Sequence, residues 1–176
     1  EHLLAALYIT GIDNALIEVS NSEIPIMDGS SKEFVETIAK VGIKNLNTKR
    51  KYLKIVKKFE LKENEKVISI EPDNNSLKVN FQLVYSNKVI GSQKNSINFA
   101  DTDLTDVYTS RTFCLFEDIE KIKKIGLAKG GSLENAVVVN DTKVLNEGGL
   151  RNEKEFVNHK ILDLAGDFLL SGYRAL

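Results

Sequence analysis

A predicted helix over residues 153–170 is the feature that most constrains the fold of this chain. At about 100° per residue, one side of this helix carries an apolar stripe, formed by Val157, Ile161, Leu164, Ala165 and Phe168. The far side carries a ridge of ionisable residues with apolar residues beside it: His159, Asp163 and Asp167 between Phe156, Leu162, Leu169 and Leu170. A helix with apolar residues on both flanks is expected to lie between two layers of the protein.

The first block of the chain is predicted to run helix, strand, loop, helix. Residues 1–9 are apolar nearly all round, which indicates a buried helix. The expected elements are a helix over residues 1–9 stopped by Gly11, a strand over 15–19, an irregular connection over 23–30, and a helix from a capping box at Ser30 and Glu33 to Gly42.

The rest of the chain is predicted to be antiparallel sheet with helices packed on it, so the fold class is α+β. Runs rich in β-branched and aromatic residues indicate strands over residues 52–56, 66–70, 77–83, 89–90 with 96–99, 111–115, 136–139 and 143–145. Helical patterns cover residues 104–108 and 117–125.

The polar, basic stretch over residues 44–51 is the best candidate for a domain boundary. We therefore divide the chain into residues 1–46 and residues 47–176. Because the chain begins at Glu1, already inside an apolar helical pattern, we interpret it as an internal fragment of a longer protein.

Composition argues against several classes of protein. The 24 basic and 25 acidic residues give no nucleic-acid footprint. The single cysteine, Cys114, excludes an internal disulfide framework and fits a reducing compartment. No apolar run approaches the ~20 residues of a membrane span. We therefore expect no nucleic-acid partner and no membrane span.

Both histidines of the chain lie beside carboxylates at spacings that suit a metal. His159 and Asp163 are four residues apart in a helix, so both side chains point from one face. A buried carboxylate costs several kcal/mol unless it is paired or metal-bound. With His2 as a third ligand, the set leaves a fourth position open, which is typical of catalytic zinc. Iron(II) or cobalt could occupy the same ligands.

Each of these motifs also has a simpler interpretation. His159 and Asp163 could form a surface ion pair, and His2 could lie in a frayed terminus. Thr112 would by default be an ordinary strand residue. Residues 130–132 are better explained as a turn than as a phosphate loop, because a strand follows them. Periodicity alone therefore leaves open both a metallohydrolase and a structural ion pair.

Several longer motifs occur in order along the chain, at residues 1–7, 11–15, 23–30, 110–113, 130–132, 144–147, 149–151 and 156–167. In this order they resemble bacterial UDP-3-O-acyl-N-acetylglucosamine deacetylases, which remove an acetyl group at the committed step of lipid A synthesis. The similarity spans nearly the whole chain and is weakest between Lys44 and Asn95. It implies a UDP-sugar lipid precursor as substrate, one zinc per chain, a monomer, and a location in the cytoplasm of a Gram-negative bacterium.

The resemblance also implies a role for each matching residue. The matches are His2, His159 and Asp163 for the zinc ligands; Glu1 for the general base; Thr112 for the oxyanion donor; Lys160 for positive charge near the substrate; and Asp167 for the carboxylate that orients a catalytic histidine. That histidine lies in a Ser-Gly-His segment, which this chain does not reach before Leu176. We therefore expect an active parent protein and a fragment with little or no activity.

The fold implied by the resemblance has two α+β domains, each a β-α-α-β sandwich with helices between two sheets. The first of these domains would be only partly present. A β-α-β insert at about residues 113–139 would form an apolar passage for the acyl chain. Its candidate lining residues, for which the alternative is an ordinary core position, are Phe113, Phe116, Ile119, Leu133 and Val138.

Two other functions stay open from the sequence. The first is a zinc amidohydrolase that acts on another N-acetyl sugar or amide, because the zinc ligands alone specify neither the UDP nor the acyl group. The second is a noncatalytic α+β domain in which the pair of His159 and Asp163 is structural.

Overall fold

The computed structural model of the chain describes residues 1–73 and 76–175. Its helices are α1 (His2–Ile9), α2 (Lys32–Val41), α3 (Thr105–Tyr108), α4 (Ile119–Lys124) and α5 (Glu155–Leu169), with a 3-10 helix η1 (Phe116–Asp118). Its strands are β1 (Tyr52–Leu53), β2 (Phe59–Glu63), β3 (Lys66–Ile70), β4 (Lys78–Val84), β5 (Ser92–Asn98), β6 (Phe113–Leu115), β7 (Val137–Val139) and β8 (Arg174–Ala175). The strands of the described residues pair into four two-stranded sheets, so the predicted α+β class is confirmed. No helix among these is both long and apolar enough to cross a membrane.

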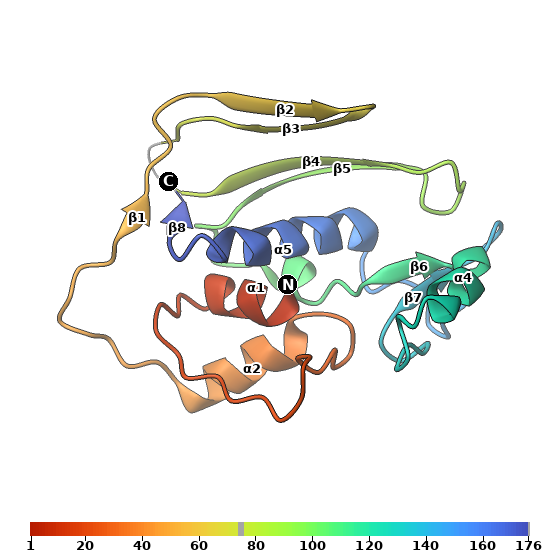
Figure 1. Cartoon of the computed structure of the whole chain (residues 1–176), viewed down its shortest axis with the longest axis horizontal. Coiled ribbons are helices and arrows are strands. Elements are labelled where there is room, and N and C mark those ends of the chain that lie inside the picture. The colour runs from red at the N-terminus through yellow and green to blue at the C-terminus, as the bar shows by residue number, and fades with distance from the viewer. Residues whose placement is uncertain (74–75, 176) are drawn as a thin grey trace.

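Helix α5 lies between the β4–β5 hairpin on one side and helix α1 on the other (Figure 1). On the hairpin side, the buried residues of the core include Val79, Leu83, Phe156, Val157 and Ile161. Burial of each large apolar side chain contributes roughly 1.5–3 kcal/mol. On the other side, Leu162 packs with Ala5 of α1 and Val107 of α3. The prediction that this helix lies between two layers is therefore confirmed.

Helices α1 and α5 touch through their backbones at Gly166. A Cβ atom at this position would lie 2.3 Å from the carbonyl oxygen of Glu1 and 3.0 Å from the nitrogen of Ala5. The neighbouring residues at this contact are also small, and Ala5, Ala6 and Ala165 are fully buried. The absence of a side chain at position 166 therefore lets the first turn of α1 lie directly on α5.

Arg174 of strand β8 holds the other end of α1. Its Nη2 donates to the carbonyl oxygens of Leu7 (3.1 Å) and Tyr8 (2.7 Å). Its guanidinium carbon lies 4.4 Å from the centroid of the Tyr8 ring. A cation is favourable at the carboxyl end of a helix, where the dipole is negative. Strand β8 itself pairs in parallel with β1.

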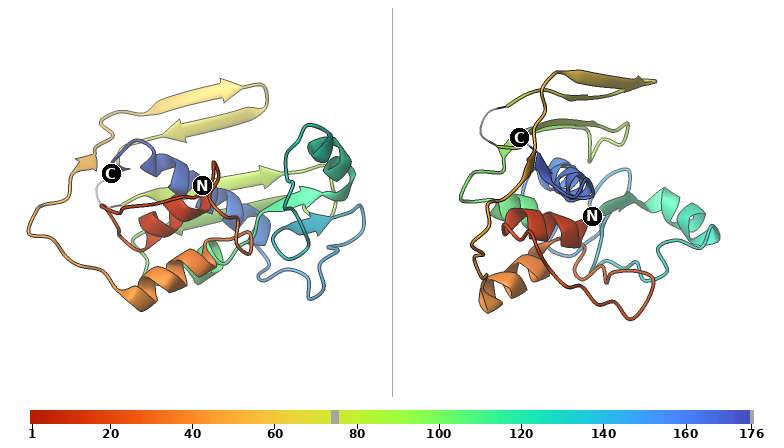
Figure 2. Two further views of the ribbon diagram at one scale, coloured as in Figure 1. Left: turned by 60° about the horizontal axis from the view of Figure 1, so that its bottom comes forward. Right: turned by 60° about the vertical axis from the view of Figure 1, so that its left-hand side comes forward.

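Residues 113–139 form a β-α-β unit to one side of α5 (Figures 1 and 2). Strands β6 and β7 are parallel, with Phe113 opposite Val137 and Leu115 opposite Val139. Parallel neighbours need a crossover connection, which here contains η1 and α4. All three residues of β7 are buried.

The predicted strand over residues 15–19 is wrong. These residues have no regular structure and all five are exposed, with Leu16 at 88%. Within the described chain no strand pairs with them. A strand needs a neighbour for its backbone groups and a face to bury, and this segment has neither.

The predicted capping box at Ser30 and Glu33 is also wrong. The N-cap of α2 is Ser31, and its hydroxyl donates to the carbonyl oxygen of His2 (2.6 Å) rather than capping the helix. The Ser30 hydroxyl donates to Asp28 Oδ1 at 2.7 Å. Ser31 therefore connects the loop before α2 to α1, and Ser30 stabilises the turn of the loop itself.

Several strand boundaries differ from the sequence prediction. Strand β2 is not predicted, because three of its five residues are charged, yet it pairs antiparallel with β3. Strand β1 covers only the start of the predicted 52–56, residues 89–90 lie in a turn, and 143–145 are reduced to a single bridge between Val139 and Val144. Two of the four pairs, β1–β8 and β6–β7, are parallel.

The α1–α5 contact can be tested by replacing Gly166 with alanine. At an exposed position in a helix, replacing glycine with alanine raises the stability of the folded protein by about 1 kcal/mol. At position 166 the new methyl group would instead clash with the α1 backbone. We therefore expect the free energy of unfolding to fall by about 1–3 kcal/mol, as measured by urea denaturation. Thr37→Ala at an exposed position of α2 is the control for helix propensity. An equal or higher stability for Gly166→Ala would contradict the close contact.

Candidate metal centre

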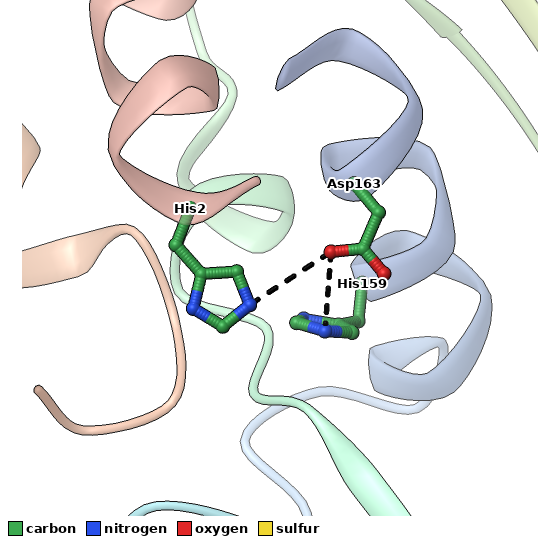
Figure 3. A group of neighbouring side chains, drawn as sticks. All are labelled: His2, His159 and Asp163. Carbon is green, nitrogen blue, oxygen red and sulfur yellow. Dashed lines mark ion pairs between the residues drawn. The ribbon is translucent and has the colours of Figure 1, made fainter. Parts of the chain in front are cut away.

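His2, Asp163 and His159 converge where the start of α1 meets α5 (Figure 3). One ligand atom of each residue lies within 4.8 Å of those of the other two. His2 Nε2 is 3.8 Å from Asp163 Oδ1, and His159 Nε2 is 3.4 Å from the same oxygen. The two rings are 5.0 Å apart between centroids. The structure thus brings together the three residues that the sequence suggests as metal ligands.

The position of each ligand follows from the helices that carry it. Asp163 lies one turn after His159 in α5, so both side chains share a face of that helix. His2 reaches the same place because Gly166 allows α1 to approach α5 closely. His159 is almost fully buried, with 1% of its surface exposed, whereas His2 and Asp163 are partly exposed. The group is therefore open on one side.

The distances between the ligand atoms fit a small divalent cation. Tetrahedral zinc with bonds of about 2.0–2.2 Å holds its ligand atoms about 3.3–3.6 Å apart. The distances of 3.4 and 3.8 Å to Asp163 Oδ1 are close to this value. Small movements of flexible side chains would complete the geometry, so the residues fit the metal that the resemblance implies.

Both imidazoles are held in the neutral form that a metal requires. Burial lowers the pKa of His159 to about 4, against the attraction of the Asp163 carboxylate for the charged ring. Burial likewise lowers the pKa of His2, again against the effect of Asp163. A neutral ring keeps one nitrogen lone pair free for a cation.

The orientation of the His159 ring is fixed by a backbone carbonyl. Its Nδ1 lies 3.0 Å from the carbonyl oxygen of Ser110. A carbonyl oxygen only accepts, so the proton of the neutral ring must be on Nδ1. Nε2 is then free to face Asp163 and a metal.

An apolar cavity of about 830 Å³ lies beside the centre. All five residues predicted for the acyl passage line it, together with Thr112. Phe113 joins the cavity to the centre, because its ring also lies 6.5 Å from that of His159 and 5.6 Å from Lys160 Nζ. One wall of the cavity was not predicted from the sequence; it is formed by the loop residues Val19, Ile24, Pro25 and Ile26. The apolar run Ile24-Pro25-Ile26 within this polar loop is the one sequence feature that could have indicated this wall.

The sequence matches the UDP-3-O-acyl N-acetylglycosamine deacetylase family over residues 1–176. This chain belongs to that family. The UDP-3-O-acyl-N-acetylglucosamine deacetylase of Nautilia profundicola is 44% identical over 173 residues, which are 98% of this chain and 59% of that protein. Proteins of the same name from Helicobacter pylori strain 26695 (43% identical, 98% of this chain, 58% of theirs) and Geobacter sp. strain M21 (44%, 100% and 58%) are similar. The chain spans about three fifths of the length of these relatives.

Of the other residues that the resemblance predicts to act in catalysis, Lys160 and Thr112 lie at the centre or its cavity. Lys160 Nζ donates to Asp163 Oδ2 at 3.0 Å. Thr112 is held by its backbone, which donates to Gly29 O and accepts from Val137 N, each at 2.7 Å. Their catalytic roles stay predictions.

Glu1 and Asp167 are both exposed, and the carbonyl oxygen of Glu1 faces Gly166, the residue before Asp167 in α5. Partial desolvation, with the carboxylates of Glu1 and Asp163, raises the pKa of Asp167. The two layers around α5 do not cover its whole ridge, because Asp167 is exposed, as is Leu170 at 73%.

Two ion pairs around the centre were not predicted. Arg151 Nη1 lies 2.8 Å from Asp28 Oδ2 and donates to the carbonyl oxygen of Thr109 at 2.9 Å, which ties the 23–30 loop to the second block. Arg111 and Glu155 form a buried pair with 2.7 Å between Nε and Oε1. Asp28, Arg111 and Arg151 belong to the matching motifs and Glu155 directly precedes the last one, but periodicity gives no sign that these residues pair.

Removal of one ligand should abolish metal binding without loss of the fold. We expect Zn²⁺ at 100 times its dissociation constant to stabilise the chain by about 2.7 kcal/mol, and Asp163→Asn to lose this effect. Thermal unfolding with and without Zn²⁺, together with the metal content of the purified protein, measures both. Asp141→Asn, the same change at an exposed loop position, is the matched control. Equal metal responses of the two variants would contradict the site.

Proposed function

We propose that this chain carries the metal centre of a zinc-dependent hydrolase that removes the N-acetyl group from UDP-3-O-acyl-N-acetylglucosamine. The observation that supports the proposal is the convergence of His2, His159 and Asp163 next to an apolar cavity. The names of the relatives at 43–44% identity point to the same reaction.

The three ligands would hold one metal ion and leave a position open for the reaction. When bound, zinc would lower the pKa of a water molecule and polarise the acetamide carbonyl, and iron(II) or cobalt could serve in its place. The chain's own groups supply the rest of the chemistry.

The residues around the ligands suit the proton transfers of amide hydrolysis. We assign to the Glu1 carboxylate the acceptance of a proton from the attacking water. The Thr112 hydroxyl would donate to the carbonyl oxygen as it gains negative charge, and the Lys160 ammonium adds positive charge beside Asp163. The amide C–N bond then breaks, acetate leaves, and the sugar amine gains a proton. Asp167 would orient the group that supplies this proton.

The cavity beside the centre suits the acyl chain of the substrate. Its walls come from the β-α-β unit, which we propose as an insert over residues 113–139, and from the 19–26 loop. Because Phe113 contacts both the cavity and the centre, an acyl chain in the cavity would bring the sugar to the metal ligands. We further propose a boundary between residues 1–46 and 47–176, a monomer, and action in the bacterial cytoplasm.

The reaction can be tested in the whole protein with the UDP-sugar substrate. We expect Glu1→Gln to lower kcat by about 10²–10⁴-fold while the zinc content stays the same. Glu36→Gln at an exposed position of α2 is the control and should leave kcat unchanged. Activity on N-acetyl sugars that lack the UDP and acyl groups, in preference to this substrate, would favour a different zinc amidohydrolase. Bound zinc with no deacetylation at all would favour a noncatalytic domain.

The passage can be tested by placing a charge inside the cavity. We expect Ile119→Glu to raise KM by about tenfold or more, equivalent to about 1.4 kcal/mol, with a smaller relative effect on stability. Ile125→Glu is the matched control, because it is the same change at the end of α4, outside the cavity and 72% exposed. A collapse of Tm with an unchanged KM would show that Ile119 is simply a core residue.

A further inference from the structure

We infer that Glu155 is a positioning residue of the metal centre, which fixes the His159 ring through the peptide bond between Ser110 and Arg111. This inference rests on the proposed metal site but on neither the substrate nor the reaction. It gives a function to the most deeply buried carboxylate of the described chain, which none of the proposed catalytic steps uses.

Glu155 lies in the first turn of α5 and is fully buried. Its two oxygens accept four N–H groups: Arg111 N (3.0 Å), Arg111 Nε (2.7 Å), Arg111 Nη2 (3.2 Å) and Arg151 N (2.6 Å). Arg111, itself 8% exposed, also donates from Nη2 to the carbonyl oxygen of Gly149 at 2.9 Å. A buried carboxylate with several charge-assisted hydrogen bonds is held in one geometry.

One of these bonds sets the direction of a carbonyl group. The nitrogen of Arg111 and the carbonyl of Ser110 belong to the same planar peptide unit, in which N–H and C=O point in opposite directions. Glu155 holds the N–H side of this unit. The C=O side then faces His159, one helical turn after Glu155 in α5. One peptide plane is thus held between Glu155 and His159, which lie four residues apart in α5.

The metal centre depends on this plane through the tautomer of His159. With Ser110 O 3.0 Å from Nδ1, the ring carries its proton there and offers Nε2 to the cation. If the plane turned, Nδ1 would lose its acceptor and the other tautomer, which has no free lone pair at Nε2, would become populated. The bidentate Arg111–Glu155 pair prevents this rotation, because the guanidinium and the backbone of Arg111 are held by the same carboxylate.

The tautomer can be measured without a metal, by long-range ¹H–¹⁵N NMR of the imidazole nitrogens. The chain has two histidines, so the signals of His159 are assigned by the loss of the other set in His2→Gln. We expect a single Nδ1–H tautomer of His159 in the unmodified metal-free chain. Glu155→Gln and Arg111→Lys should each give a mixture of both tautomers. A dominant Nε2–H tautomer in the unmodified chain would overturn the inference, whether or not either variant folds.

Metal affinity provides the second readout, with Co²⁺ as a coloured probe. Loss of a group that orients a metal ligand typically lowers metal affinity about 10–100-fold, and we expect this for both variants. Ile90→Val, which loosens the core away from the centre, is the control for general destabilisation and should keep the single tautomer and the affinity. Folded variants with an unchanged tautomer and affinity, or failure of both variants to fold, would reduce the pair to a purely structural role and overturn the inference. Absence of deacetylation alone would affect the proposed function and not this inference.

Discussion

The contact between the α1 backbone and Gly166 determines whether the metal ligands can meet. His159 and Asp163 keep their relation through one helix, whatever the rest of the protein does. His2 belongs to another helix, so its distance from Asp163 depends on how closely the two helices approach. Helices with ordinary side chains at the contact pack 8–10 Å apart. Here a glycine faces the backbone of Glu1 and Ala5, and the first residues of α1 reach the face of α5 that carries the ligands.

The sequence predicts well those parts of the protein that are set by local patterns. Helix α5 and strands β3 and β4 lie within about two residues of their expected bounds, because each has a clear local pattern. In α5 and β4 the apolar periodicity reflects the layers that cover them, whereas β3 is largely exposed and follows its alternating β-branched residues. The failures depend on partners that periodicity does not reveal. Residues 15–19 have strand-like composition but nothing to pair with, whereas the charged strand β2 forms because β3 lies beside it.

The same division holds for the site. The spacing of His159 and Asp163 is local and predicts that their side chains share one helix face, whereas no spacing rule predicts that His2, at the other end of the chain, meets them; the sequence could only suggest it as a third ligand. The pairing of Arg111 with Glu155 depends on the orientation of one peptide plane, and no spacing rule predicts that orientation. Burial is also not local: the sequence gives no reason to expect that desolvation outweighs the attraction of Asp163 for a charged His159 ring. With both rings neutral, the ligand set carries one negative charge, so a divalent cation would leave a positive charge next to Lys160, which suits an oxyanion.

The contacts of Arg174 affect how helix α1 can separate from the rest of the protein. Arg174 donates hydrogen bonds to the last carbonyl groups of α1, and Gly166 lets the first turn of α1 lie against α5. Helix α1 is therefore anchored at both ends by residues from the carboxyl-terminal part of the chain. Sliding or rotating α1 enough to withdraw His2 would break both anchors together. Release of the ion and detachment of α1 should therefore form one cooperative step, in which the amide protons along α1 exchange with solvent together rather than from one end.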